Sequence, residues 1–317
     1  MSPESRNSPF HNEQRRLHSR KSILVLRAAV IREIRNFFIS NDYLEVETPL
    51  LVSAPAPEVH IDAISTSAGY LHTSPELCMK RMLAAGFTKI FQISKCFRAG
   101  ERGHRHLPEF CLLEWYRTGI DYHDLMTECR ELTLWVCRKI LGQQEIHYQG
   151  EKIDIQSPWK RIPVADVFDR FASITMEDAL STDRFDEIMA IEIEPRLGSM
   201  GPVFLYDYPA SLASLARLKA NQPEYSERFE WYMGGMELGN GFSELTDSRE
   251  QRARFEQASK QRNALGKECY PMPERFLDAL GQMPESGGMA VGIDRLVMIL
   301  SDRSVIDDVV AFTPEEV

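Results

Sequence analysis

Residues 97–117, FRAGERGHRHLPEFCLLEWYR, concentrate arginine and histidine side chains between two apolar runs. The whole chain has a formal net charge of −10, so this local basic cluster does not follow from the overall composition. Guanidinium groups bind phosphate oxygens through directed, charge-assisted hydrogen bonds. The loop therefore predicts a site for an anion such as a polyphosphate.

The strand expected directly after this loop carries a second polar group. Because side chains alternate along a strand, one face holds Phe110, Leu112, Glu114 and Tyr116, and the other holds Cys111, Leu113 and Trp115. A carboxylate and a phenol on a rather apolar face predict a partly buried pocket for a cation. An ordinary solvent-facing strand with a chance glutamate explains the same pattern.

A third polar group is expected on a hairpin near residues 229–245. If Gly234 and Gly235 form a two-residue turn, Glu230 and Glu237 become diagonal neighbours. Two carboxylates this close favour a bound cation, and oxygen ligands alone favour Mg²⁺ shared with phosphates. Strict alternation places Glu237 on the wrong face, so a β-bulge is needed, and a glycine at 239 or 241 would suit it. A solvated hairpin is the alternative.

Two further segments complete the set. Asn240, Phe242 and Glu244 share one face of the second hairpin strand, and GGMAVGIDRLVMIL places Arg295 at the start of an apolar helix. Arg295 is suited to stack on a flat ring or to contact a phosphate, although a surface ion pair with Asp294 is the simpler explanation. A polyphosphate loop, a magnesium pair and a cation pocket together predict ATP-dependent activation of a basic small molecule.

These residues need a sheet to bring them together. Helical spacing of apolar residues is found over residues 22–41, 74–86 and 122–141, and strand patterns lie between them and again after residue 203. We expect an α+β domain over residues 22–317, with an antiparallel sheet flanked by helices and an insertion of small helices at about 150–200. Residues 1–21 are polar and predict a disordered tail.

Composition limits the function further. A sequence pI near 5.4 argues against sequence-independent nucleic-acid binding. The six cysteines show no CxxC pair or metal-ligand spacing, which indicates reduced thiols of a cytoplasmic protein. We expect no signal peptide and no membrane span, because the apolar run at residues 23–31 is short and contains Arg27.

These polar segments resemble motifs 2 and 3 and the amino-acid pocket of class II aminoacyl-tRNA synthetases, specifically the lysyl branch, and the resemblance extends from about residue 22 to the C-terminus. It implies a class II catalytic domain, with LEVETPLL as the dimer-interface segment of a homodimer. It implies ATP contacts from Arg98, Glu101, Arg105, His106, Phe110 and Arg295, with Arg98 and Arg295 catalytic and the adenine held between Phe110 and Arg295. It implies Mg²⁺ at Glu230 and Glu237, and a lysine pocket formed by Glu76, Glu114, Tyr116, Asn240, Phe242, Glu244 and Ala290.

Lysyl-tRNA synthetases also carry an N-terminal OB-fold that reads the anticodon, and here the first motif arrives before residue 50. The chain therefore resembles the stand-alone paralogues, which transfer (R)-β-lysine, and α-lysine more weakly, to a lysine of elongation factor P instead of tRNA. Ala290, where lysyl-tRNA synthetases usually have glycine, agrees with this substrate. We thus expect no anticodon recognition and an acceptor that is a protein.

One departure keeps two alternatives open. The family usually follows the motif arginine with Asn-Glu, whereas this chain has Ala99-Gly100 and then Glu101. The loss of these polar groups would fit a non-catalytic, synthetase-like regulatory subunit. A lysyl-adenylate ligase that uses another acceptor is the second alternative.

Overall fold

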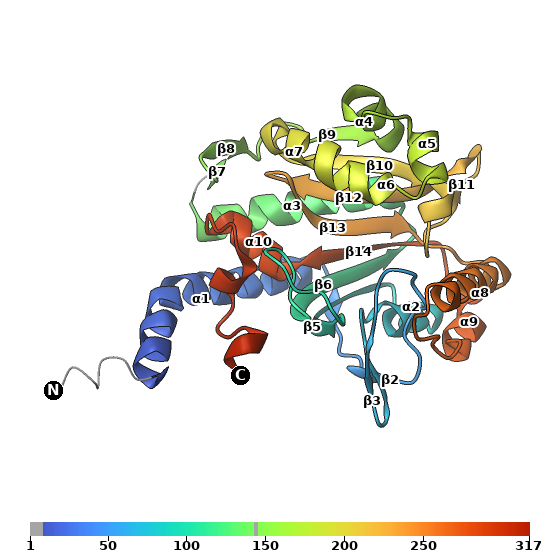
Figure 1. Ribbon diagram of the computed structural model, residues 1–317, viewed down its shortest axis with the longest axis horizontal. Helices are drawn as coiled ribbons and strands as arrows, with labels where there is room; N and C mark the ends of the chain where they lie inside the picture. Colours follow the sequence, from blue (N-terminus) through green and yellow to red (C-terminus); the bar gives the residue numbers. More distant parts are fainter. Residues whose placement is uncertain (1–8, 143–144) are drawn as a thin grey trace.

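The computed structural model describes residues 9–142 and 145–317, and a nine-stranded mixed sheet runs through this part of the chain (Figure 1). Eight of the strands form one series in which each is hydrogen-bonded to the next, and the ninth, β11 (Leu218–Lys219), pairs with β12. In order across the sheet they are β1 (Leu44–Glu45), β5 (Lys89–Phe97), β6 (Glu109–Thr118), β14 (Ser286–Gly292), β13 (Met236–Ser243), β12 (Gln222–Met233), β10 (Val203–Pro209) and β9 (Lys160–Pro163). The strands from β5 to β10 are antiparallel as predicted, whereas β1 and β9 add parallel edges.

One face of this sheet is covered by helices and forms the main core. The helices are α1 (Pro9–Ser40), α3 (Tyr122–Ile140) and α10 (Ile293–Leu300). Side chains from every second position of the central strands are fully buried against them, among them Leu113, Trp115, Phe229, Trp231 and Val291. The polar residues singled out above occupy the alternate positions and so face the other way.

Helix α1 begins at Pro9, so the predicted disordered tail over residues 1–21 is wrong for residues 9–21; residues 1–8 lie outside the described residues. Contacts from far along the chain account for this. Arg16 and Arg20 form ion pairs with Glu316, and Arg20 also donates to the carbonyl of Ala311. Figure 1 shows this part of α1 beside the C-terminal segment. These ion pairs stabilise the part of α1 before residue 22, where the sequence is polar.

The expected insertion contains strands as well as small helices. It starts with the hairpin β7 (Glu145–Tyr148) and β8 (Glu151–Asp154), and continues through β9 to the small helices. These are α4 (Val164–Phe171), α5 (Met176–Ser181), α6 (Phe185–Ile188), η2 (Met189–Ile193), α7 (Glu194–Leu197) and η3 (Gly198–Met200). They form a second apolar cluster with β10 and the tip of β12 (Figure 1).

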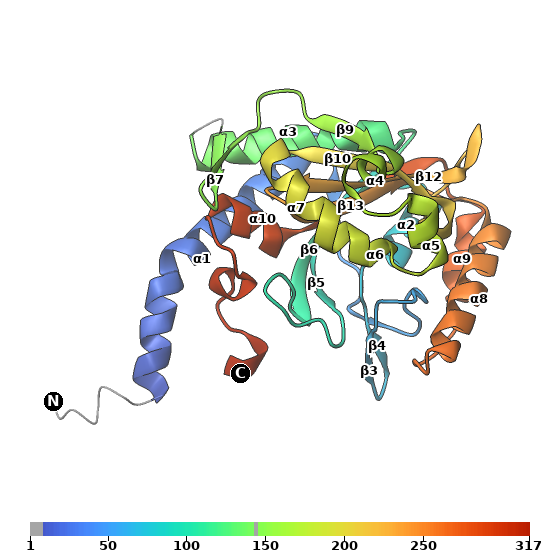
Figure 2. The same ribbon diagram turned by 45° about the horizontal axis from the view of Figure 1, so that its top comes forward.

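A third layer borders the polar face of the sheet. It consists of α2 (Glu76–Ala84), α8 (Ser248–Ala264), α9 (Glu274–Leu280) and a small sheet of β2 (Leu51–Val52), β4 (Gly69–Leu71) and β3 (Ile64–Thr66). The β3–β4 hairpin and the loop between β5 and β6 project from the same side of the main sheet in both views (Figure 2). The remaining short turns are η4 (Ala210–Leu212), η5 (Ile306–Val309) and η6 (Pro314–Glu316).

Two expectations from composition can be compared with the structure. The cysteines are all free thiols in the described chain, and four of them are buried. Among the described residues, no helix is both long and apolar enough to span a membrane.

Candidate active site

The strand register aligns the predicted site residues in rows across the polar face. Glu114 of β6 lies opposite Ala290 of β14, Ala290 opposite Asn240 of β13, and Asn240 opposite Glu230 of β12. The next row runs from Tyr116 through Gly288 and Phe242 to Arg228. Residues far apart in the sequence thus become neighbours at one side of the sheet.

A cavity of about 400 Å³ lies over these rows. Its walls include nearly every residue predicted for the site: Glu76, Arg98, Glu101, Arg105, His106, Phe110, Glu114, Tyr116, Glu230, Glu237, Asn240, Phe242, Ala290 and Arg295. Glu244 is buried directly behind this wall. Glu114 is only 1% exposed, so the alternative of a solvent-facing strand is wrong.

One end of the cavity, called the amine end below, is lined by buried carboxylates, a chemistry suited to an ammonium group. The carboxylate of Glu114 accepts hydrogen bonds from Ser74 Oγ (2.6 Å) and from the Tyr116 hydroxyl (2.8 Å). Burial raises the pKa of Glu114 to about 7, and the nearby carboxylate of Glu76 adds to the effect. Burial likewise raises the pKa of Glu244 to about 8, against the opposing influence of Lys80. These carboxylates gain from a cation that replaces the lost solvation.

Lys80, which sequence reasoning missed, already provides one cation. Its Nζ atom lies 2.5 Å from Glu76 Oε1, 2.5 Å from Glu244 Oε2, and 5.0 Å from the centre of the Phe242 ring. Glu244 Oε1 has no hydrogen-bond partner among the described residues. Three carboxylates therefore face one buried ammonium group, which leaves room for further positive charge. The only sequence signal was the four-residue spacing between Glu76 and Lys80 on one helix.

Gly288 is required by the close packing of this pocket. A Cβ atom at this position would lie 2.2 Å from Glu244 Oε1 and 2.4 Å from the Tyr116 ring. Both neighbours are buried, so neither has free space to move into. The glycine therefore lets the backbone of β14 approach the two side chains that contact the amine site.

The predicted hairpin is present, and the residues that flank its turn are buried. Gly234 and Gly235 have φ angles of 58° and 71°, as a two-residue hairpin turn requires. Met233 and Met236, on either side of this turn, are fully buried, so the solvated-hairpin alternative is wrong. The turn brings Glu230 and Glu237 to the wall of the same cavity.

The bulge that this geometry needs is at Leu238, not at a glycine. Trp231 pairs with Gly239 and Tyr232 pairs with Glu237, so Leu238 is the extra residue. The predicted positions have another constraint: a Cβ atom on Gly239 would lie 2.4 Å from the carbonyl oxygen of Ala290, and one on Gly241 2.5 Å from Met289 Sδ. Both glycines are thus explained by close packing between strands.

The carboxylates of Glu230 and Glu237 differ in their electrostatics. Burial and then the charge of Glu237 raise the pKa of Glu230, although Arg228 Nη2 (2.7 Å) and the Tyr232 hydroxyl (2.6 Å) donate to it. Burial opposes ionisation of Glu237 too, but Arg295 Nη1, 3.1 Å away, more than offsets this and lowers its pKa.

This pair has the chemistry that Mg²⁺ prefers. Both donors are carboxylate oxygens, and the two charges repel each other across the cavity. Within the described residues no group of three or more His, Cys, Asp or Glu side chains is arranged to hold a metal ion. The pair fits an ion that takes its remaining ligands from water and phosphates.

Glu194 was missed, because the insertion offered no chemical pattern. The Tyr232 hydroxyl that donates to Glu230 also lies 3.4 Å from Glu194 Oε1. Burial, followed by the charges of Glu237 and Glu230, raises the pKa of Glu194 to about 7. The insertion thus adds a third acidic side chain beside the predicted pair.

The arginine and histidine side chains form the opposite end of the cavity. Arg98 lies over the Phe110 ring, with Cζ 5.0 Å from its centre, and its Nη1 is 3.8 Å from Glu101 Oε1. Arg105 Nη1 donates to the carbonyl of Gly235 (3.2 Å), and Arg295 Nη2 lies 2.6 Å from His106 Nε2. Arg98 therefore covers the Phe110 ring. Arg295, which is expected to hold the adenine against that ring, donates to the Glu237 carbonyl (2.8 Å).

The alternative of a surface ion pair between Asp294 and Arg295 is wrong. Asp294 is 3% exposed, forms an ion pair with Arg27 of α1 (2.5 Å) and accepts the backbone N–H of Cys111 (2.7 Å). Asp294 thus connects α1, β6 and α10, and Arg295 lines the cavity instead.

Arg228 is another residue that sequence reasoning missed. Its guanidinium group donates to Asn240 Oδ1 (3.0 Å), Glu230 Oε1 (2.7 Å) and the carbonyl of Leu212 (2.8 Å). It thereby links the amine end of the cavity to the acidic pair. Its position two residues before Glu230 on the same strand face was the available signal.

The unusual Ala99-Gly100 pair has a structural role in the backbone. The N–H of Ala99 donates to the carbonyl of Asp62 (2.7 Å), which joins the arginine loop to the loop that precedes β3. Gly100 has a φ angle of 77°, a conformation that favours glycine.

Comparison with known proteins agrees with this geometry. The family model described as "tRNA synthetases class II (D, K and N)" matches residues 9–316. The "Elongation factor P--(R)-beta-lysine ligase" of Sodalis glossinidius is 39% identical over 312 residues, which cover 92% of this chain and 95% of that protein. The proteins of the same name from Erwinia tasmaniensis and Salmonella dublin are 40% and 39% identical, again over 92% of this chain and over 94% of each of those proteins. The chain therefore belongs to the class II (D, K and N) tRNA synthetase family and is a relative of the elongation factor P–(R)-β-lysine ligases.

Proposed function

We propose that this chain is an ATP-dependent ligase that activates (R)-β-lysine, and α-lysine more weakly, and transfers it to the ε-amine of a lysine on elongation factor P. The names of the relatives support the substrate and the acceptor. The observation that carries the proposal is the row from Glu114 through Ala290 and Asn240 to Glu230. This row joins the end of the cavity that suits an amine to the end whose glutamate, arginine and histidine side chains suit ATP.

The amine end explains the preference for a diamine. Glu76, Glu114 and Glu244 together carry more negative charge than Lys80 neutralises. β-Lysine contributes two ammonium groups. Ala290 lies in the centre of the row between Glu114 and Asn240, where its methyl group shapes the floor beneath the substrate. A methyl group in such a pocket contributes about 1–3 kcal/mol to discrimination, so α-lysine is disfavoured but not excluded.

The opposite end performs the activation. The carboxylate of the substrate attacks the α-phosphorus of ATP, the bond to pyrophosphate breaks, and an aminoacyl-adenylate forms. Arg98 neutralises charge at the α-phosphate, and Arg105 and His106 neutralise the outer phosphates. Phe110 and Arg295 hold the adenine, and catalysis arises mainly from positioning and charge stabilisation. Glu230 and Glu237 would hold Mg²⁺, which supplies further positive charge to the phosphates.

The N-terminal elements support a homodimer. Large apolar side chains are exposed on α1 and on the segment that follows it: Val25 is 63% exposed, Ile39 57%, Leu44 52% and Leu50 41%. Exposed apolar groups that gather on neighbouring elements are typical of a protein interface. We propose that a second copy of this chain covers them.

Arg98→Ala tests the activation step. We expect it to abolish lysine-dependent ATP–pyrophosphate exchange, because Arg98 is the side chain assigned to neutralise charge at the α-phosphate. Arg102→Ala is the matched control, since Arg102 belongs to the same loop but pairs with Asp307 (2.8 Å) and Glu315 (2.8 Å). Near-normal exchange by Arg98→Ala would contradict the assignment.

Intact mass spectrometry separates the proposal from its alternatives. The chain is mixed with ATP, each lysine isomer and purified elongation factor P. A β-lysyl mass increase of the factor supports the proposal. Adenylate without a mass increase indicates another acceptor, and ligand binding without adenylate indicates a regulatory subunit.

A further inference from the structure

Glu58 occupies a position that none of the assignments above explains. It lines the main cavity and also a second cavity of about 320 Å³, and the two share Glu58, Thr73, Ser74 and Glu76 in their walls. The second cavity is largely apolar, with Ala54, Pro55, Leu77, Met272 and Phe276 in its lining. Glu58 therefore places a carboxylate where an apolar passage meets the reaction site.

The side chain of Glu58 is weakly held. Among the described residues, its one hydrogen-bond donor is Ser214 Oγ, at 3.4 Å, which is a long contact. Burial and the charge of Glu76 raise the pKa of Glu58, while Arg98 and Arg228 oppose the rise. Arg98, the residue assigned to the α-phosphate, lines the same cavity, so Glu58 shares the cavity in which the reaction is proposed to occur.

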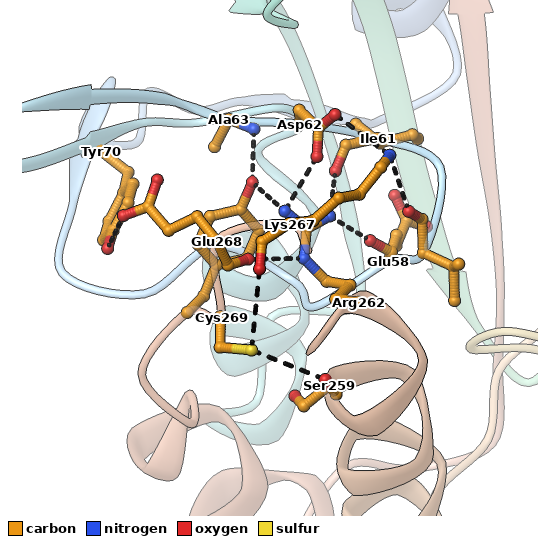
Figure 3. A network of polar contacts seen from close by, with 12 residues as sticks. Glu58, Ile61, Asp62, Ala63, Tyr70, Ser259, Arg262, Lys267, Glu268 and Cys269 are labelled. Carbon is orange, nitrogen blue, oxygen red and sulfur yellow. Dashed lines mark hydrogen bonds and ion pairs between the residues drawn. The ribbon is translucent and has the colours of Figure 1, made fainter. Parts of the chain in front are cut away.

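The backbone of Glu58, in contrast, is firmly fixed (Figure 3). Arg262 of α8, which is fully buried, donates to the carbonyls of Glu58 (2.7 Å) and Ile61 (3.0 Å). Lys267 Nζ donates to the carbonyl of Val59 (3.0 Å) and to Asp62 Oδ2 (3.1 Å).

The hydrogen bond from the Ala99 N–H to the Asp62 carbonyl then ties this segment to the arginine loop. The fixed backbone sets the position of Glu58, and the few partners of its carboxylate leave the oxygens free to accept a proton.

The other acidic groups of the cavity have assigned partners. Glu76 and Glu244 contact Lys80, Glu114 accepts from Ser74 and Tyr116, and Glu230 accepts from Arg228 and Tyr232. Of the described acidic residues, Glu58 and Glu76 line both cavities, and Glu58 is the one of the two without a close partner. An ammonium group that arrives on an aliphatic chain through this cavity would reach Glu58 where the two cavities meet.

We propose that Glu58 is the general base of the transfer step, and that the side chain of the acceptor lysine reaches it through the second cavity. This inference rests on the proposed function. The Glu58 carboxylate takes one proton from the ε-ammonium group of the acceptor. The free amine attacks the carbonyl carbon of the adenylate, a C–N bond forms, and the C–O bond to AMP breaks with its electron pair leaving on the phosphate. The second proton of the nitrogen passes to solvent.

Glu58→Gln tests this role because it keeps the size of the side chain and removes the base. We expect β-lysine-dependent ATP–pyrophosphate exchange to stay near the wild-type rate, which also verifies folding. Single-turnover transfer from preformed adenylate to elongation factor P should fall about 100- to 10,000-fold. Hydroxylamine, which is largely uncharged at neutral pH and needs no base, should form the hydroxamate at the wild-type rate.

Glu274→Gln is the matched control. Glu274 also lines the second cavity, but its carboxylate is 56% exposed and pairs with Arg252, so the variant should transfer normally. Wild-type transfer by Glu58→Gln would overturn the inference, and so would a parallel loss of exchange and transfer, or an equal loss with hydroxylamine. Failure of the wild-type protein to modify elongation factor P would instead count against the proposed function.

Discussion

Substrate binding is coupled to proton release, because the amine pocket is built from buried carboxyl groups. The pKa of Glu114 is raised to about 7 and that of Glu244 to about 8, in both cases mainly by burial. Near pH 6 both groups therefore hold protons in the free protein. A bound ammonium group favours the ionised forms and lowers these pKa values again.

The affinity for β-lysine should consequently rise with pH. Below its pKa in the free protein, each carboxyl group must release a proton on binding, which contributes up to about tenfold in affinity per pH unit. We expect most of the gain between pH 6 and 8 and a plateau above. Isothermal titration calorimetry in buffers of different ionisation enthalpy measures the released protons directly. Glu114→Gln should remove part of this release, whereas a pH-independent affinity in the wild-type protein would contradict the role of both groups.

The residues found from sequence share one property. Glu114, Tyr116 and Asn240 follow the two-residue period of their strands, so their common face could be predicted locally. Lys80 and Glu58 could not be found in this way. The role of Lys80 depends on its contact with Glu244, and the position of Glu58 depends on its contact with Arg262. Each of these contacts joins residues that are more than 150 positions apart in the sequence. Such residues become visible only when the sheet and α8 are in place.

The glycines of β13 and β14 determine how closely these strands and the neighbouring side chains pack. The need for a bulge followed from alternation, but its position did not, because Gly239 and Gly241 are required by contacts with Ala290 and Met289. Leu238 is therefore the extra residue. A sequence shows that a glycine is present, but not which neighbour excludes a side chain there.

Gly288→Ala tests this packing at the amine pocket. The added Cβ atom would displace Glu244 Oε1 and the Tyr116 ring, 2.2 Å and 2.4 Å away. Overpacking of this kind costs about 1–3 kcal/mol, which corresponds to about 5- to 150-fold weaker β-lysine binding if the pocket bears the cost. Calorimetry measures the affinity and thermal unfolding the stability.

Gly281→Ala is a suitable control for this variant, because a Cβ atom there would contact nothing within 4 Å. Unchanged β-lysine binding by Gly288→Ala would show that the two side chains have room to move.

Helix α1 connects parts of the molecule that are distant in the sequence. Arg16 and Arg20 contact Glu316, and Arg27 contacts Asp294 at the start of the helix that carries Arg295. Helix α1 also packs on α3 over the back of the sheet (Figure 2). Its exposed apolar residues and the edge strand β1 lie outside this packing. A contact between two copies at this surface would therefore involve α1, the helix whose Arg27 pairs with Asp294 beside Arg295 at the ATP end of the cavity.

Leu44→Glu tests whether this surface is the dimer interface. Leu44 is 52% exposed on β1, so a charge there is tolerated by the isolated chain, whereas burial of an unpaired carboxylate between two copies costs several kcal/mol. We expect light scattering after size-exclusion chromatography to give a dimer mass for the wild-type protein and a monomer mass for Leu44→Glu. Leu265→Glu, at a 60% exposed leucine beyond the end of α8, should leave the dimer intact. If both variants keep the wild-type mass, the exposed apolar residues of α1 and β1 do not hold a second copy.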